Sequence, residues 1–194
     1  VELNAPVRTH NMFAVAARNS VIRQKQELFG DAGIGVSVID IPEMAQRNIA
    51  TLLEPEGRGL AMLSFNEDGG LLTVNFRGEL YLSRRIDVSL AQLADEDFDR
   101  KTATFDRITL ELQRSLDHFD RQYNYVSVAK LLLAPMQAEG LAEYLSSNLY
   151  TPVDTFDLGS VLDLSAVPSL AERTEQQRFF ILLGAALRQE EVRL

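Results

Sequence analysis

The residues whose types could do chemistry are gathered in one tight turn, Asn66-Glu67-Asp68-Gly69-Gly70. The turn joins two strand-like segments, and in one large class of nucleotide-binding domains a turn at this position holds phosphate. Its carboxylates, Glu67 and Asp68, and its glycines, Gly69 and Gly70, are residue types that occur in such loops. The same types also make ordinary hairpin turns, because Asn, Asp and Gly tolerate positive φ. The turn is therefore either a phosphate grip or a plain reversal of the chain, and we favour the plain reversal.

A second pair of interest, Glu111 and Arg114, lies three residues apart in a segment with helical periodicity. Residues at this spacing are neighbours on a helix surface, where an ion pair stabilises the helix by about 0.2–0.5 kcal/mol. Taken alone, Glu111 and Arg114 are interpreted as such an exposed ion pair. His118 follows one turn later, and we expect it to be a partly buried structural residue rather than a catalyst.

The remaining sequence lacks the motifs that usually carry covalent or phosphate chemistry. It has no G-x-S-x-G, no P-loop and no G-x-G-x-x-G. Gly33-Ile34-Gly35 follows an expected helix and precedes an expected strand, the reverse of the dinucleotide-binding order, so we interpret it as a helix C-cap. The chain has no cysteine, which excludes disulfides and thiolate metal sites, and its two histidines, His10 and His118, are too far apart to suggest a zinc site.

Charge and hydropathy narrow the range of partners. The 194 residues carry a formal net charge of -9, which argues against a nucleic-acid partner because the phosphates would be repelled. No run of about 18 apolar residues occurs, so we expect no membrane span. The sequence leaves the oligomeric state open, and a homo-oligomer is compatible with it.

Three successive strands position the candidate turn. We expect them at residues 60–65, 71–76 and 79–86, the first covered on both faces and the third alternating apolar and polar residues. An acidic patch at 95–99 is expected to be a solvated loop or helix start. The later elements are predicted as a helix over about 104–123, a strand over 126–133, a helix over 137–149, a short strand at 151–153, a loop-like segment at 158–170 and a largely buried final helix over 174–188.

The first part of the chain shows a strand–helix–strand–helix order. The predicted elements are a strand over 12–17, a helix over 21–31, a strand over 36–41 and a helix over 43–53. The first helix is expected to bury a stripe formed by Val21, Ile22, Leu28 and Phe29. The Pro- and Gly-containing segment 54–59 is the predicted boundary between sub-domains.

Four segments of the chain carry a resemblance to known proteins. They are AVAARNSVIRQKQELFGDAGIGVSVIDIPEMAQRNIA, LSFNEDGGLLTVNFRGELYLSRRI, ITLELQRSLDHFDRQY, and VAKLLLAPMQAEGLAEYLSSNLYTPV with the tail FFILLGAALR. Together they resemble the C-terminal two-thirds of the PilM-type proteins of type IV pilus assembly, above all the MshI-type proteins of the mannose-sensitive haemagglutinin (MSHA) pilus. The resemblance implies an α/β, actin-like (ribonuclease H-like) fold with a mixed sheet and flanking helices. It assigns residues 1–56 to part of a small inserted βαβ subdomain with its linking helix, and 57–194 to the second actin-like lobe.

The chain departs from that family where nucleotide would bind. The family's hairpin has an Asp-Ile-Gly turn that binds metal-linked phosphate, and here Ser64-Phe65-Asn66 stands in its place. A Gly-Gly-Ser turn near adenosine is replaced by Ala134-Pro135-Met136, whose Cβ atoms and proline ring would crowd a purine. Relatives place groups near ribose and adenine at the positions of Glu111 and Arg114. The resemblance thus makes Glu67, Asp68, Gly69, Gly70, Glu111 and Arg114 the candidate cofactor-binding residues of a degenerate nucleotide cleft.

The resemblance also implies a partner and a location. PilM-type proteins dock to the short cytoplasmic tail of an inner-membrane pilus assembly protein, and residues 11–53 with the cleft beside them would be the favoured surface. We expect a non-catalytic assembly component that is cytoplasmic and peripheral to the bacterial inner membrane. No cofactor is expected, and ATP with Mg²⁺ would bind only together with an N-terminal lobe preceding Val1. The alternatives are an active or nucleotide-gated ATPase of pilus assembly, or the cytoplasmic domain of a type II secretion L-type protein.

Overall fold

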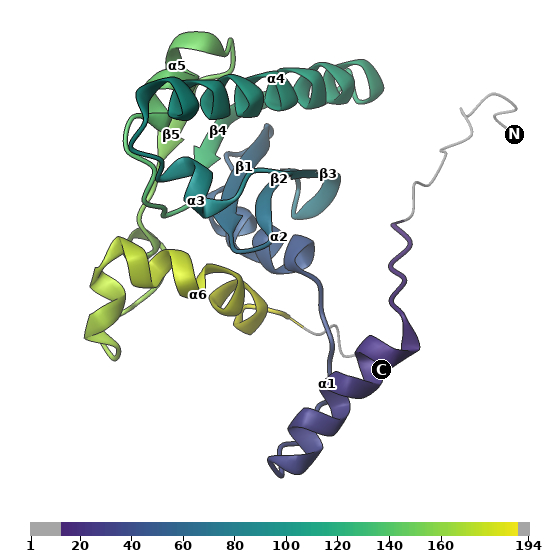
Figure 1. Cartoon of the computed structure of the whole chain (residues 1–194). Coiled ribbons are helices and arrows are strands. Elements are labelled where there is room, and N and C mark those ends of the chain that lie inside the picture. The colour runs from purple at the N-terminus through teal and green to yellow at the C-terminus, as the bar shows by residue number, and fades with distance from the viewer. Residues whose placement is uncertain (1–12, 190–194) are drawn as a thin grey trace, which may run out of the picture. The chain divides into compact units, whose positions relative to one another are not determined.

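The computed structural model describes residues 13–189 and divides the chain into two compact units, Val1–Ile39 and Asp40–Leu194 (Figure 1). The division predicted after residue 56 stays a prediction. None of the helices within 13–189 has both the length and the apolar character that crossing a bilayer requires.

The described part of the first unit contains one helix, α1 (Asn19–Asp31), between segments without regular secondary structure. The helix was predicted correctly, but its predicted buried stripe is wrong, because α1 buries none of its residues. The strands predicted at 12–17 and 36–41 are also wrong over the described residues, since 13–17 and 36–41 form no ladder. An apolar run such as 13–17 or an alternating segment such as 36–41 makes a strand only when a neighbouring strand pairs with its backbone N–H and C=O groups.

The second unit is built on a five-stranded mixed sheet in the order β3-β2-β1-β4-β5. Strand β1 pairs antiparallel with β2 and β2 with β3, whereas β4 is parallel to both β1 and β5. The three strands expected around the candidate turn are confirmed, because their apolar runs and Gly-containing turns are local signals. The strands are β1 (Gly59–Asn66), β2 (Gly69–Phe76), β3 (Glu79–Ile86), β4 (Val128–Leu133) and β5 (Val153–Thr155).

Helices cover both faces of this sheet (Figure 1). The larger core, with Leu63, Ile108 and Leu131 at its centre, lies under α4 and α5, and the smaller core, with Met62 and Phe180, lies under α2 and α6. The helices are α2 (Pro42–Leu53), α3 (Leu90–Leu93), α4 (Phe98–Gln122), α5 (Leu141–Asn148) and α6 (Arg173–Ala186), with 3-10 turns η1 (Leu158–Ser160) and η2 (Pro168–Ala171).

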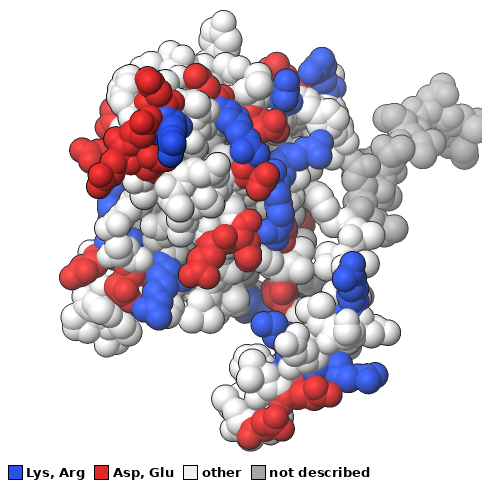
Figure 2. Space-filling model, in the orientation of Figure 1, with Lys and Arg blue, Asp and Glu red and all other residues white. Residues whose placement is uncertain are grey.

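The residue that precedes each helix explains why α4 and α5 begin away from their predicted starts. Helix α4 begins at Phe98 because the Asp97 side chain accepts a hydrogen bond from the Arg100 N–H, at 2.9 Å. The acidic patch is therefore the solvated start of this helix, and acidic side chains gather over that region in Figure 2. Helix α5 begins only at Leu141, because Gly140 precedes it with a φ of 85°.

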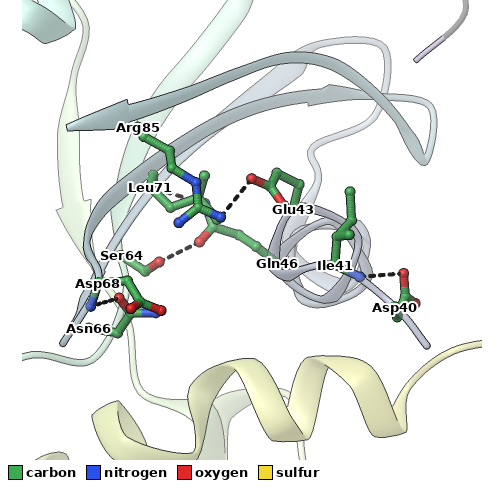
Figure 3. A network of polar contacts seen from close by, with 9 residues as sticks. All are labelled: Asp40, Ile41, Glu43, Gln46, Ser64, Asn66, Asp68, Leu71 and Arg85. Atoms are coloured by element: carbon green, nitrogen blue, oxygen red, sulfur yellow. Dashed lines mark hydrogen bonds and ion pairs between the residues drawn. The ribbon is translucent and has the colours of Figure 1, made fainter. Parts of the chain in front are cut away.

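One buried side chain, Gln46, fastens α2 to the sheet (Figure 3). The two N–H groups of its Nε2 are shared among three acceptors, the Met62 and Leu71 carbonyls at 2.9 and 3.2 Å and the Thr73 hydroxyl at 2.9 Å. Its Oε1 accepts from the Ser64 hydroxyl. Gln46 has no exposed surface, and its amide is satisfied on both sides, so it fixes α2 against β1 and β2 together.

We expect Gln46→Leu to lower the free energy of unfolding by about 2–4 kcal/mol, because the buried hydroxyls of Ser64 and Thr73 lose their amide partner. Urea denaturation measures the change. Gln24→Leu, at an exposed site on α1, is the matched control and should change the free energy by less than about 0.5 kcal/mol. Equal effects of the two substitutions would contradict the role of Gln46.

Tyr81 of β3 packs among aromatic rings on the α4 face, with centroids 5.9 Å from Phe76, 6.4 Å from Phe119 and 5.1 Å from Tyr123. Burial raises the pKa of the Tyr81 hydroxyl, and Tyr125 raises it further. A raised pKa in the folded state favours the neutral phenol. Its contribution to stability is present below the unfolded pKa and is lost as pH rises through the folded pKa.

Tyr81→Phe should therefore weaken the loss of stability that the protein shows above about pH 10. Urea midpoints measured from pH 8 to 11 test this, with Tyr150→Phe, at an exposed site, as control. If Tyr81→Phe and Tyr150→Phe gave the same pH profile, titration of Tyr81 would not be linked to folding.

Candidate functional site

Two loops that the sequence analysis singled out meet at one edge of the sheet. Strands β1 and β4 run parallel, with Leu63 opposite Leu133, so Asn66 and Ala134 follow at the same end. Ligands of open α/β sheets bind outside the carboxyl ends of parallel strands. The β1–β2 turn and the β4–α5 loop therefore form the candidate site, together with the first turns of α6 that contact both.

The β1–β2 turn is closed by its own hydrogen bonds. The Asn66 Oδ1 accepts from the Asp68 N–H at 2.9 Å (Figure 3), and the antiparallel ladder continues to the pair Asn66–Gly69. The side chains of Glu67 and Asp68 are exposed. An N–H group that could face an anion is thus already occupied by Asn66.

Packing, rather than anion binding, accounts for the two glycines of this turn. Gly69 has a φ of 112°, a conformation that other residues rarely adopt. A Cβ on Gly70 would lie 2.6 Å from Cε1 of Phe65 and 3.0 Å from Cβ of Ile86. Both glycines are buried in the sheet, which fits a plain hairpin turn.

Ser64 stands where the resemblance places the metal-binding acid, but it faces away from the edge. It is buried under α2, and its hydroxyl donates to Gln46 (Figure 3). The hydroxyl group of Ser64 therefore binds the side chain of Gln46 in α2 and does not point toward a ligand at the edge.

Gln177 of α6 joins the two loops, a role that the sequence analysis missed. Its Nε2 donates to the Phe65 carbonyl at 3.3 Å, and its Oε1 accepts from the Gln137 N–H at 3.1 Å. The last part of β1 and the β4–α5 loop are thus connected through one side chain. No sequence signal distinguishes Gln177 from any other polar residue of an amphipathic helix.

Two hollows lie along this edge. One of about 440 Å³ adjoins the β1–β2 turn and is lined by Asn66, Glu67, Asp68, Leu90, Thr174, Gln177 and Arg178. A larger one of about 920 Å³ lies over the β4–α5 loop and the beginning of α4. Ala134 and Met136, which the resemblance places near adenosine, line the larger hollow.

The other predicted pair, Glu111 and Arg114, is not brought to this edge. Their side chains form an ion pair at 3.3 Å on α4 and line neither hollow. Lys101 of the same helix lines the larger hollow, and ten residues of helix place Glu111 about 15 Å further along the axis. His118 was expected to be partly buried, and this is wrong, because its side chain is exposed on the same helix.

The described part of the chain contains no cluster of side chains that could bind a metal ion. Within residues 13–189, no group of three or more His, Asp or Glu side chains is arranged to hold a metal ion. Glu67 and Asp68 are exposed, and both line the smaller hollow together with Arg178.

The fold is similar to that of a chain in a solved structure described as the PilM-PilN type IV pilus biogenesis complex. The TM-score is 0.70 and the sequence identity 22%, over 89% of this chain and 58% of the solved one. This chain therefore spans less than two thirds of the length of that chain. The likeness confirms the expected α/β fold with a mixed sheet and flanking helices. No protein-family model matches the sequence, and no curated protein is significantly similar to it.

Gly70→Ala should destabilise the protein by about 1–3 kcal/mol, because the added methyl group overlaps the Phe65 ring. Gly35→Ala is the matched control, since a Cβ there meets nothing within 4 Å. Thermal or urea unfolding measures both variants. An unchanged stability of Gly70→Ala would show that packing does not require this glycine.

Proposed function

We propose that this protein is a non-catalytic component of type IV pilus assembly, of the MSHA type, that docks a PilN-like inner-membrane protein. It would act at the cytoplasmic face of the inner membrane by binding the short cytoplasmic tail of that partner. The observation that carries the proposal is the fold likeness to a chain of the PilM-PilN complex, with a TM-score of 0.70 over 89% of this chain. The resemblance of the sequence to MshI-type proteins supports the MSHA assignment.

The hydrogen bonding at the sheet edge supports a role without nucleotide chemistry. The Asp68 N–H is occupied by Asn66, and the Gln137 N–H by Gln177. A phosphate could accept from either N–H group only by competing with the side-chain oxygen that already accepts from it. We therefore propose that no cofactor is bound.

The docking surface is proposed to lie within residues 11–53. In the described part of this segment, large apolar side chains are exposed, among them Leu28 at 62% and Phe13 at 51%. Exposed apolar groups that lie close together typically mark sites of protein interaction. On α1, Val21 and Leu28 are seven residues apart and so share one face of the helix.

Isothermal titration against a synthetic peptide of the PilN-like partner's cytoplasmic tail tests the proposal. We expect binding with a Kd in the micromolar range, and we expect Leu28→Asp to weaken it at least about tenfold, because burial of a leucine is lost and a charge must be desolvated. Gln26→Asp, which adds the same charge elsewhere on α1, is the control and should change the Kd little. Absence of heat at high micromolar peptide would reject the proposed partner.

A further inference from the structure

The larger hollow at the sheet edge combines an apolar floor with a negatively charged rim. Its volume of about 920 Å³ lies within the range of pockets that bind ligands. The floor comes from side chains at the end of β4 and the loop after it, including Leu133, Ala134 and Met136. Phe98, the first residue of α4, also lines the hollow and is 79% exposed. An aromatic ring with this exposure offers a contact for an apolar side chain from outside.

The rim carries more negative than positive charge. Four carboxylates line the hollow, those of Asp95, Glu96, Glu139 and Glu143, against two cations, Lys101 and Arg173. The ammonium group of Lys101 lies 5.9 Å from the centre of the Phe105 ring. Within residues 13–189, no lysine or arginine forms an ion pair with any of the four carboxylates.

These carboxylates decide which class of occupant the hollow favours. The triphosphate of a nucleotide would be repelled by this excess of negative charge, whereas Lys and Arg side chains would find carboxylates that are not already held in ion pairs by the described residues. The apolar floor and Phe98 favour a hydrophobic residue next to the cations. The combination fits a short basic segment with an apolar anchor.

We propose that this hollow receives a basic, apolar-anchored peptide segment, namely the juxtamembrane part of the membrane partner's tail. The identity of the source rests on the proposed function, but the chemistry of the hollow does not. Cytoplasmic segments beside membrane helices are enriched in Lys and Arg, so such a tail carries the required charge where it leaves the membrane. The residues that line the hollow lie outside the segment 11–53 of the sequence.

The peptide Lys-Arg-Leu-Leu-Lys is the probe, with Glu-Glu-Leu-Leu-Glu as its charge-reversed control. Amide NMR shifts of Phe98, Gly140 and Ala142 report occupancy of the hollow. We expect the basic peptide to shift these amides saturably and the acidic peptide to leave them unchanged. Raising the salt concentration from 50 to 200 mM should weaken the binding, because the contacts are partly exposed ion pairs.

The double variant Glu139→Gln and Glu143→Gln should weaken binding of the basic peptide about three- to tenfold. Both side chains are exposed, so the variant is expected to fold. The control is Asp117→Asn with Asp120→Asn, which removes the same charge from exposed positions near the other end of α4.

Equal affinities of the two double variants, or no shift at the three amides, would overturn the inference. The inference and the proposed function can fail independently. Binding of the short basic peptide without any binding of the partner's tail would support the hollow and contradict the proposed function. Binding of the tail that is unaffected by Glu139→Gln with Glu143→Gln would do the reverse.

Discussion

The buried amide of Gln46 is the contact on which the arrangement of the second unit depends most. It connects one helix to two strands through four hydrogen-bonding partners, and one of these strands, β1, leads into the candidate site. In a low-dielectric interior such bonds are strong when all are made and costly when one is missing. The amide therefore restricts α2 to one position on the sheet, and it uses the hydroxyl of Ser64, the residue that replaces the expected metal-binding acid.

At the sheet edge, too, polar side chains are hydrogen-bonded to neighbouring backbone groups. Asn66 closes the β1–β2 turn, and Gln177 joins the last residues of β1 to the loop after β4. An active phosphate site requires backbone N–H groups that point at the anion and are free to donate. Here two N–H groups at the edge, those of Asp68 and Gln137, already donate to side chains of the protein itself.

The sequence allowed the sheet to be predicted, since the turn 66–70 and the apolar strand 60–65 are local signals with a defined period. It did not allow the strands at 12–17 and 36–41 to be rejected, because an apolar run and an alternating segment both resemble strands, and over the described residues only the absence of a pairing partner decides. The roles of Gln46 and Gln177 also could not be predicted from the sequence. A glutamine in an amphipathic helix is usually a surface residue, and only the tertiary structure shows which carbonyl and N–H groups lie within its reach.

Among the candidate residues, Glu67, Asp68, Gly69 and Gly70 lie at the sheet edge, whereas Glu111 and Arg114 form their own ion pair along α4. The interpretation of Glu111 and Arg114 as an i,i+3 pair needed only helical periodicity. Their distance from the edge could be known only from the start and direction of α4 in the structure. This helix begins at Phe98 because Asp97 caps it.

We propose that the edge of the sheet does not bind nucleotide. The most direct measurement is a titration with Mg-ATP up to about 1 mM, the upper end of common KM values, followed by the amide NMR signals of Asp68, Gly69 and Gln137. Because Asn66 and Gln177 occupy the donors of Asp68 and Gln137, we expect these signals to keep their positions throughout the titration. A saturable shift of all three amide signals would show that nucleotide binds at the sheet edge and would contradict this proposal.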